Sequence, residues 1–129
     1  MSATLTAADQ ALELLDAMDL LFNETKVAEE RRGELRVPFF RPVSVTIEGQ
    51  PFGSIAAFSR DLSPLGIGLV HNVPLETGEV VVSVPVADDQ PLHFRTEICW
   101  AQPFGKDWYI SGGRFLSVVP SPDVAGQDA

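Results

Sequence analysis

The sequence is short of the features that usually disclose a protein's chemistry. Its 129 residues include a single cysteine, Cys99, so the chain forms no internal disulfide and no cluster of thiolate metal ligands. No apolar run approaches the roughly 20 residues that a membrane-spanning helix needs. Acidic residues interrupt the apolar positions near the N-terminus, which argues against a secretory leader. We therefore expect a cytoplasmic protein without a membrane segment.

Recognisable catalytic machinery is also missing. The two histidines, His71 and His93, are not spaced as metal ligands, and nothing in the sequence couples either of them to Cys99 as a base to a nucleophile. No paired catalytic carboxylates and no phosphate-cradling P-loop occur. We predict a non-enzymatic protein with no metal and no cofactor, in which Cys99 is a buried or half-buried residue of a strand.

Positive charge is scarce, because 9 Lys and Arg residues face 18 Asp and Glu residues and the formal net charge is -9. General nucleic-acid binding depends on broad neutralisation of phosphates, so this balance argues against it. Against that background one short window is basic and holds Arg31, Arg32, Arg36 and Arg41. Such a window suits a small phosphorylated ligand, which needs only a few well-placed guanidinium groups.

The N-terminal part of the chain, from about Thr6 to about Arg31, is expected to be a long helix, because it lacks proline and glycine inside and its apolar residues recur three and four positions apart. The stripe consists of Ala8, Ala11, Leu15, Met18 and Phe22, widened by Leu12, Leu14 and Leu21. Two interpretations remain open: a helix packed on the neighbouring domain, or a helix that pairs with its copy in a homodimer. The heptads are too few for a coiled coil.

From Val37 the pattern changes to the alternation of β-strands. Strands are expected at about 43–47, 52–60, 65–71, 80–84, 94–100 and 107–116, with a tight connection at 61–64 and a turn at 103–106. Six short strands without intervening helices predict a mainly β fold, a six-stranded antiparallel barrel. The chain then divides into a helical extension (1–30), a barrel domain (31–119) and a disordered tail (120–129).

The basic window contains the segment Arg32-Gly33-Glu34-Leu35-Arg36, preceded by Arg31. It lies between the expected helix and the first strand, where Gly33 lets the chain leave helical geometry. Two arginines separated by three residues can converge on one ligand, and a guanidinium can bind phosphate oxygens or the acceptor edge of guanine. A solvated basic turn that balances nearby carboxylates is the simpler interpretation, and for this segment alone it is favoured.

The second segment is Asp61-Leu62-Ser63-Pro64-Leu65-Gly66. Asp and Ser are common in turns because their side chains bond to nearby backbone N–H groups, and Gly66 can adopt backbone conformations closed to other residues. A turn between strands therefore explains this segment alone. In a binding site, Asp61 and Ser63 would offer polar groups to a base or a sugar-phosphate oxygen, while Gly66 would allow close approach to the backbone.

Taken together, the two motifs, in this order and separation on six expected strands, resemble the PilZ domain family. Its members are small six-stranded barrels that bind the bacterial second messenger cyclic di-GMP. The resemblance covers residues 31–119 and extends to other segments. These are the run 61–69, the segment 74–78 before a valine-rich strand, the strand ending in Ile98-Cys99-Trp100, and Gly112-Gly113-Arg114-Phe115.

The resemblance implies roles for the motif residues. Arg32 and Arg36 would hold phosphates and guanine edges of the ligand. Asp61 and Ser63 would contact the other guanine or its backbone, and Gly66 would keep the surface open.

Two further residues follow from the same resemblance. Gly112 is a weaker candidate for close backbone approach. Arg31 stands where a basic residue in the family accompanies a stacked pair of nucleotides, so a ligand dimer is expected.

Two features depart from the family. The helix that many relatives carry after the last strand has no counterpart here, whereas an unusually long helix is expected before the domain. Glu34 also lies between the two motif arginines, where a carboxylate near the ligand would repel a dianion by about 1 kcal/mol. The resemblance therefore indicates the ligand but leaves its affinity open.

Three functions compete. The first is a cytoplasmic, non-enzymatic receptor in which cyclic di-GMP orders the arginine loop and changes how the N-terminal helix is presented to a protein partner. The second is a ligand-independent adaptor that acts through protein contacts, and the retained motif residues count against it. An enzyme is the third, and it lacks any candidate catalytic group.

Overall fold

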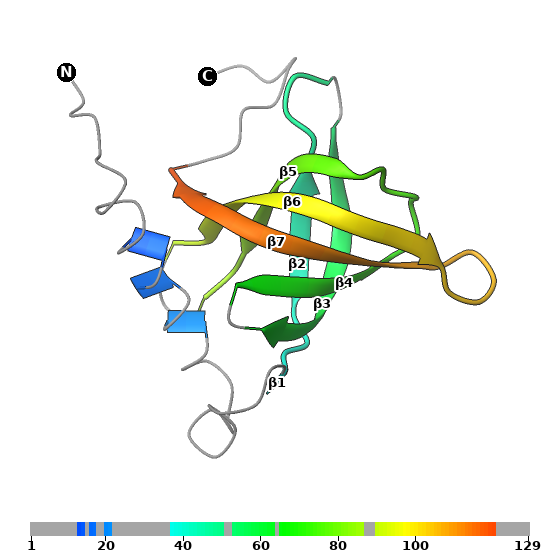
Figure 1. The fold of residues 1–129 in the computed structure, drawn as a ribbon, viewed down its shortest axis with the longest axis horizontal. Helices are drawn as coiled ribbons and strands as arrows, with labels where there is room; N and C mark the ends of the chain where they lie inside the picture. Colours follow the sequence, from blue (N-terminus) through cyan, green and yellow to red (C-terminus); the bar gives the residue numbers. More distant parts are fainter. Residues whose placement is uncertain are drawn as a thin grey trace.

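The chain folds as a mainly β domain (Figure 1). The computed structural model describes residues 13, 14, 16, 17, 20, 21, 37–50, 53–63, 65–86 and 90–120. Its strands are β1 (Val37–Pro38), β2 (Pro42–Thr46), β3 (Ser54–Ser63), β4 (Gly66–His71), β5 (Gly78–Val84), β6 (Leu92–Pro103) and β7 (Tyr109–Val119). All the pairings between them are antiparallel.

The sheet closes on itself. Its order runs β3-β2-β5-β6-β7-β4, and β4 pairs again with β3. Strand β2 pairs with the N-terminal part of β3, and the short β1 pairs with the C-terminal part of β3. Together β1 and β2 therefore form one interrupted strand. The predicted six-stranded antiparallel barrel is confirmed. Closure matters because it leaves no long unpaired strand edge.

The interior of the barrel is filled by the inward-facing residues of strands β2 to β7, which alternate along each strand with outward-facing ones. Phe94 on β6 and Phe115 on β7 stack with ring centroids 4.3 Å apart, and both are almost fully buried. The other strand residues of this core are aliphatic: Val43, Val45, Ala57, Leu62, Ile67, Leu69, Val80, Val82, Val84 and Ile98. Because side chains alternate between the two faces of a strand, their neighbours point to the outer surface of the barrel.

The N-terminal part contributes to the same core. Leu14, Ala17 and Leu21 are buried in it, whereas Leu20 is exposed. The predicted helix lies mostly outside the described residues and stays a prediction, as do the boundaries of the extension and the tail. No helix among the residues that the structure describes is long and apolar enough to cross a bilayer.

Strand β3 differs from the expectation for this segment. The tight connection predicted at 61–64 is wrong, because β3 continues to Ser63 and pairs Leu62 with Ile67 of β4. The register shifts between Ser59 and Asp61, so Arg60 is an extra residue, a β-bulge. Leu62 is fully buried, and its packing in the core keeps the chain in the sheet beyond the bulge.

Cys99 also differs from its expected place. A second register shift lies between Ile98 and Trp100 of β6, with Cys99 between them. Cys99 is exposed, not buried or half-buried. The buried positions of β6 are Phe94, Thr96 and Ile98, so Cys99 faces outward by alternation, and the bulge makes the next residue, Trp100, face outward as well.

Candidate ligand-binding site

Four of the seven sequence-predicted site residues lie on one outer surface of the barrel. Asp61 and Ser63 are on β3, Gly66 begins β4, and Gly112 is on β7. The predicted arginines Arg31, Arg32 and Arg36 lie outside the described residues, as does Glu34.

The strand register arranges this surface in two parallel rows. The first row runs across four neighbouring strands through Asp61, Gly68, Gly112 and Trp100. The second row runs beside it through Ser63, Gly66, Arg114 and Glu97. Residues directly opposite in a sheet share a face, and Ile67 and Leu69, which flank Gly68 in sequence, point into the core. We call these eight residues, together with Arg60, the glycine face.

Gly66, Gly68 and Gly112 occupy the middle of the glycine face, and all three are buried, because side chains of neighbouring strands cover Gly68 and Gly112 and one lies beside Gly66. A Cβ on Gly68 would lie 2.5 Å from Asp61 Oδ1 and 2.9 Å from an Arg60 guanidinium nitrogen. A Cβ on Gly66 would lie 2.5 Å from a β7 carbonyl oxygen. Gly66 is not among the described glycines with positive φ, so its expected conformational role is wrong and close strand approach explains it instead.

Arg60 and Asp61 border the face on its β3 side. The bulge places both side chains over Gly68, so two adjacent residues of one strand present a cation and an anion to the same surface. Their Nε–Oδ2 separation is 3.8 Å, longer than a hydrogen bond. Arg60 Nε has no hydrogen-bond partner among the described residues. The buried Arg60 Nε is therefore an unsatisfied donor beside Asp61 among the described residues.

Trp100 borders the face on its β6 side. Its indole lies in the space that a side chain on Gly112 would fill, so it rests directly on the β7 backbone. The residue is 38% exposed, which leaves part of the ring open to solvent. An exposed indole on a glycine offers a flat apolar surface on which a base can stack.

Arg114 and Glu97 complete the second row. Arg114 donates to the Glu97 carboxylate at 2.6 Å, and both side chains are exposed. Arg114 is also the lateral partner of Gly66, so it lies directly beside the glycines of the face. The glycine face thus carries two described arginines, one on each side of its glycines.

The segment that follows the arginine motif pairs with β3, the strand that carries Asp61 and Ser63. Val37, the residue after Arg36, pairs with Leu62, which lies between Asp61 and Ser63. Arg36, the last residue of the arginine motif, therefore directly precedes β1, and β1 pairs with the part of β3 that carries Asp61 and Ser63. Segments 25 residues apart in sequence meet at this border of the face.

Ser59 fixes the next part of that chain. Its hydroxyl donates to the Phe39 carbonyl at 2.6 Å and accepts from the Arg41 N–H at 2.8 Å. The Phe39 N–H donates to the Arg60 carbonyl at 3.2 Å. These bonds hold residues 39–41 against β3 at the bulge, so the path of the chain after the arginine motif is set by buried polar contacts.

Sequence reasoning assigned no site role to five residues of this surface, which are Arg60, Gly68, Glu97, Trp100 and Arg114. Gly68 lies two positions after Gly66, so alternation alone places both on one face. Arg114 lies two positions after Gly112 and is found the same way. Arg60 and Trp100 reach the face only because each lies at a bulge, and no sequence pattern marked those bulges.

The architecture defines the class of protein: a small closed β-barrel whose outer surface presents arginines, carboxylates and an indole around a strip of buried strand glycines. Residues 30–123 match the PilZ domain family, and the chain belongs to that family. PilZ domains are in general non-enzymatic binding domains and cyclic di-GMP receptors. No curated protein was found that matches the chain.

Proposed function

We propose that this protein is a cyclic di-GMP receptor that binds the nucleotide between the arginine loop and the glycine face. The observation that carries the proposal is the pairing of Val37 with Leu62, because it brings the chain after Arg36 to Asp61 and Ser63. A ligand bound at that border contacts both motifs at once. Neither segment offers on its own enough groups to hold a dinucleotide.

The chemistry of the two segments is complementary to the ligand. Cyclic di-GMP carries two anionic phosphates and two guanines. Arg32 and Arg36 supply guanidinium groups that pair with phosphate oxygens and with the O6/N7 edge of guanine. Asp61 and Ser63 offer a carboxylate and a hydroxyl to guanine N–H groups or to the sugar-phosphate backbone. Arg31 provides further charge for a second, stacked nucleotide.

The glycine face adds groups that extend this site. Gly68 makes room for the side chains of Arg60 and Asp61, and Gly112 seats Trp100. The open part of the indole suits base stacking. Arg60 and Arg114 bring two more guanidinium groups to an otherwise acidic protein, which supports binding of an anion at this surface.

In this proposal the output is conformational. The ligand orders the arginine loop against β3 and changes how the N-terminal segment meets a protein partner, in the bacterial cytoplasm. Leu14, Ala17 and Leu21 are buried in the barrel core, so a change at the arginine motif is transmitted along the chain to a segment that shares the core. A ligand shifts such an equilibrium only by its difference in affinity between the two arrangements.

Isothermal titration of the full chain with cyclic di-GMP tests the receptor function, with Arg32→Ala as the loss-of-binding control. Heat that saturates for the wild type and disappears in the variant supports the proposal, and its stoichiometry distinguishes one nucleotide from a stacked pair. No heat at high micromolar ligand would rule the proposal out. Light scattering with and without nucleotide then reports whether the chain is a monomer or a homodimer.

A ligand-independent adaptor is the second candidate, and one observation favours it. Phe40 is 71% exposed and stacks on Phe58, with ring centroids 5.2 Å apart and planes inclined by 8°. Exposed stacked aromatics suit a protein contact. A pull-down of a partner that is unaffected by nucleotide and lost in Phe40→Ser supports the adaptor, whereas nucleotide-dependent capture supports the receptor.

A further inference from the structure

The ion pair between Glu97 and Arg114 occupies the end of the second row of the glycine face. The two residues are lateral partners on β6 and β7, and Arg114 is in turn the lateral partner of Gly66 on β4. Arg114 therefore has a carboxylate on one side and a residue without a side chain on the other. Its guanidinium is bound to Glu97 at 2.6 Å.

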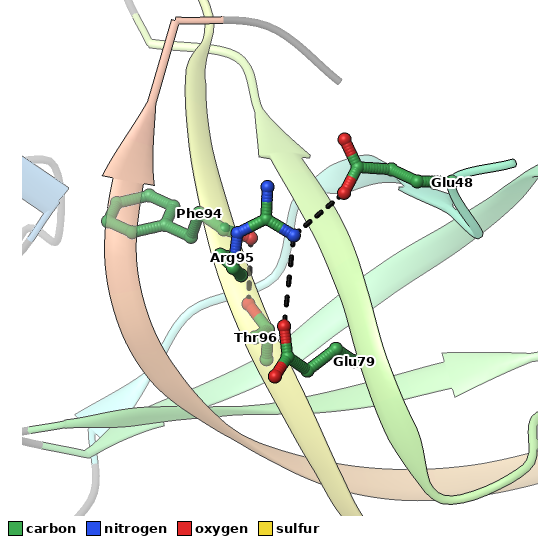
Figure 2. Close-up of polar contacts among 5 residues, drawn as sticks. All are labelled: Glu48, Glu79, Phe94, Arg95 and Thr96. Carbon is green, nitrogen blue, oxygen red and sulfur yellow. Dashed lines mark hydrogen bonds and ion pairs between the residues drawn. The ribbon is translucent and has the colours of Figure 1, made fainter. Parts of the chain in front are cut away.

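A second ion-pair cluster of the barrel shows what a structural arginine looks like in this protein. Arg95 on β6 donates to Glu48 at 2.7 Å and lies 3.8 Å from Glu79, so two carboxylates surround it (Figure 2). Its side chain is 34% exposed, whereas that of Arg114 is 61% exposed. Among the described residues Arg114 is paired with one carboxylate, that of Glu97, and it is much more open to solvent than Arg95, so a competing anion reaches it easily.

Glu97 itself has an unfavourable neighbour. Glu79 on β5 is its directly opposite residue, so the row that holds Arg114 ends in two carboxylates side by side. Like charges directly opposite in a sheet destabilise it. Arg114 offsets this repulsion for Glu97, while Arg95 lies near Glu79. Removing Arg114 from Glu97 would leave Glu97 opposite Glu79 without its own counter-charge.

From this geometry we propose that Glu97 is an internal competitor for the ligand, which holds Arg114 away from the binding surface and thereby sets the ligand concentration at which the site fills. The inference rests on the proposed receptor function. In the empty protein the Glu97 carboxylate takes the place of a ligand anion on Arg114. Binding exchanges one ion pair for another, with Arg114 turning across Gly66 toward the ligand.

The physical basis is competition for one guanidinium. The ligand gains a charge-assisted hydrogen bond to Arg114 but breaks the bond to Glu97 and exposes the repulsion between Glu97 and Glu79. Both Arg114 and Glu97 are exposed, so the pair is screened and its strength is modest. Replacement of Glu97 by neutral glutamine should tighten binding about three- to tenfold. The gain has two sources: the ligand no longer has to break an exposed ion pair, and one negative charge near the ligand is removed.

A double-mutant cycle on the full chain separates this competition from simple charge repulsion. The Kd for cyclic di-GMP is measured by isothermal titration for the wild type, Glu97→Gln, Arg114→Gln and the double variant. The competition predicts a tighter Kd for Glu97→Gln and a weaker one for Arg114→Gln. It also predicts that Glu97→Gln has little effect once Arg114 is glutamine. An equal gain in both backgrounds would mean that Glu97 acts only through its charge, and would overturn the inference.

Glu79→Gln is the matched control, because it removes the same charge from the next strand of the same row and does not contact Arg114. Long-range repulsion would give it an effect close to that of Glu97→Gln, which would contradict the proposed competition. A clearly smaller change supports it. Circular dichroism and a urea unfolding curve for each variant verify that the barrel is folded.

Failure of the inference and failure of the receptor function give different results. Wild-type binding with no gain in Glu97→Gln overturns the competition alone. Binding by Glu97→Gln where the wild type shows none supports the competition. It means that Glu97 raises the ligand concentration needed to fill the site above the concentrations used. The absence of binding in every variant overturns both proposals.

Discussion

The indole of Trp100 rests on Gly112, its lateral partner across β6 and β7, in the space that any side chain at position 112 would need. The contact joins Gly112, which the family resemblance marked as a weaker candidate for backbone approach, to Trp100, to which it gave no role in the site. It gives Gly112 a physical role, because glycine is needed there to seat the ring.

Gly112→Ala should lift the indole of Trp100 from the sheet. Because apolar ring surface then returns to water, we expect the free energy of unfolding to fall by about 1–2 kcal/mol and the fluorescence of Trp100 to shift to longer wavelength. Urea unfolding and emission spectra in a Trp108→Phe background, which leaves Trp100 as the single tryptophan, measure both effects. The loss of stability should be small when Gly112→Ala is made in Trp100→Ala; an undiminished loss there would show that the ring is not its cause.

Asp61→Asn should weaken cyclic di-GMP binding about tenfold, because it removes an acceptor that faces the glycine face from β3. Titration calorimetry provides the Kd. Asp107→Asn is the matched control, since it makes the same change at a described residue with φ of 65°, a conformation that asparagine tolerates. Equal Kd changes in the two variants would point to a general charge effect and against a contact at Asp61.

Arg60→Gln and Arg95→Gln remove the same charge with opposite expected results. Arg60 lies over Gly68 with an Nε that has no hydrogen-bond partner among the described residues, so its loss should weaken cyclic di-GMP binding roughly fivefold and change stability little. Arg95 is bonded to Glu48, so its loss should lower the free energy of unfolding by about 1 kcal/mol and leave the Kd nearly unchanged. Calorimetry measures the Kd and urea unfolding the stability of both variants. A weaker Kd in Arg95→Gln together with an unchanged Kd in Arg60→Gln would contradict the prediction.

Acid should destabilise the barrel through His71. Its Nδ1–H donates to the Val73 carbonyl at 2.7 Å, so its neutral Nε2 accepts from the Ser111 hydroxyl at 2.8 Å. Burial lowers the pKa of His71 below its usual value of 6.5, and the hydrogen bond to Val73 opposes this only in part. Between pH 6.5 and the lower folded pKa, the unfolded chain binds the proton and the folded protein does not.

The free energy of unfolding should therefore fall as the pH drops below 6.5, by at most about 1.4 kcal/mol per pH unit from this residue, and His71 should add no slope above that value. Burial also lowers the pKa of His93, so the measurement belongs in a His93→Gln background. Urea unfolding at roughly pH 7.5 and pH 5.5 tests this. A slope that survives His71→Gln would assign the acid sensitivity to other groups.

Much of the fold could be predicted from local pattern. Alternation through Val43 and Val45, and again through Val80, Val82 and Val84, marks strands because each such residue must face the core. Errors arose where the alternation breaks. Strand β3 was ended too early because Asp61 and Ser63 have turn chemistry, whereas the burial of Leu62 between them keeps the segment in the sheet.

The sequence identified the motif residues of the candidate site but not the residues that surround them. Asp61, Ser63, Gly66 and Gly112 do share one surface, although the three predicted loop arginines lie outside the described residues and their contacts stay predictions. Arg60 and Trp100 were missed for one reason. Each owes its outward direction to a bulge, and a one-residue shift in register moves a side chain to the other face.

The sequence by itself determined that this protein is an acidic, single-cysteine β domain with a basic loop and a polar glycine-containing motif, because composition and the period of hydrophobicity are properties of the chain alone. Only the tertiary structure decided which residues stand beside those motifs. Closure of the barrel pairs β4 with both β3 and β7, so residues from four strands meet in two rows. Hydrogen-bond register and bulges, which depend on packing across the whole core, then set Trp100 on Gly112 and Glu97 on Arg114.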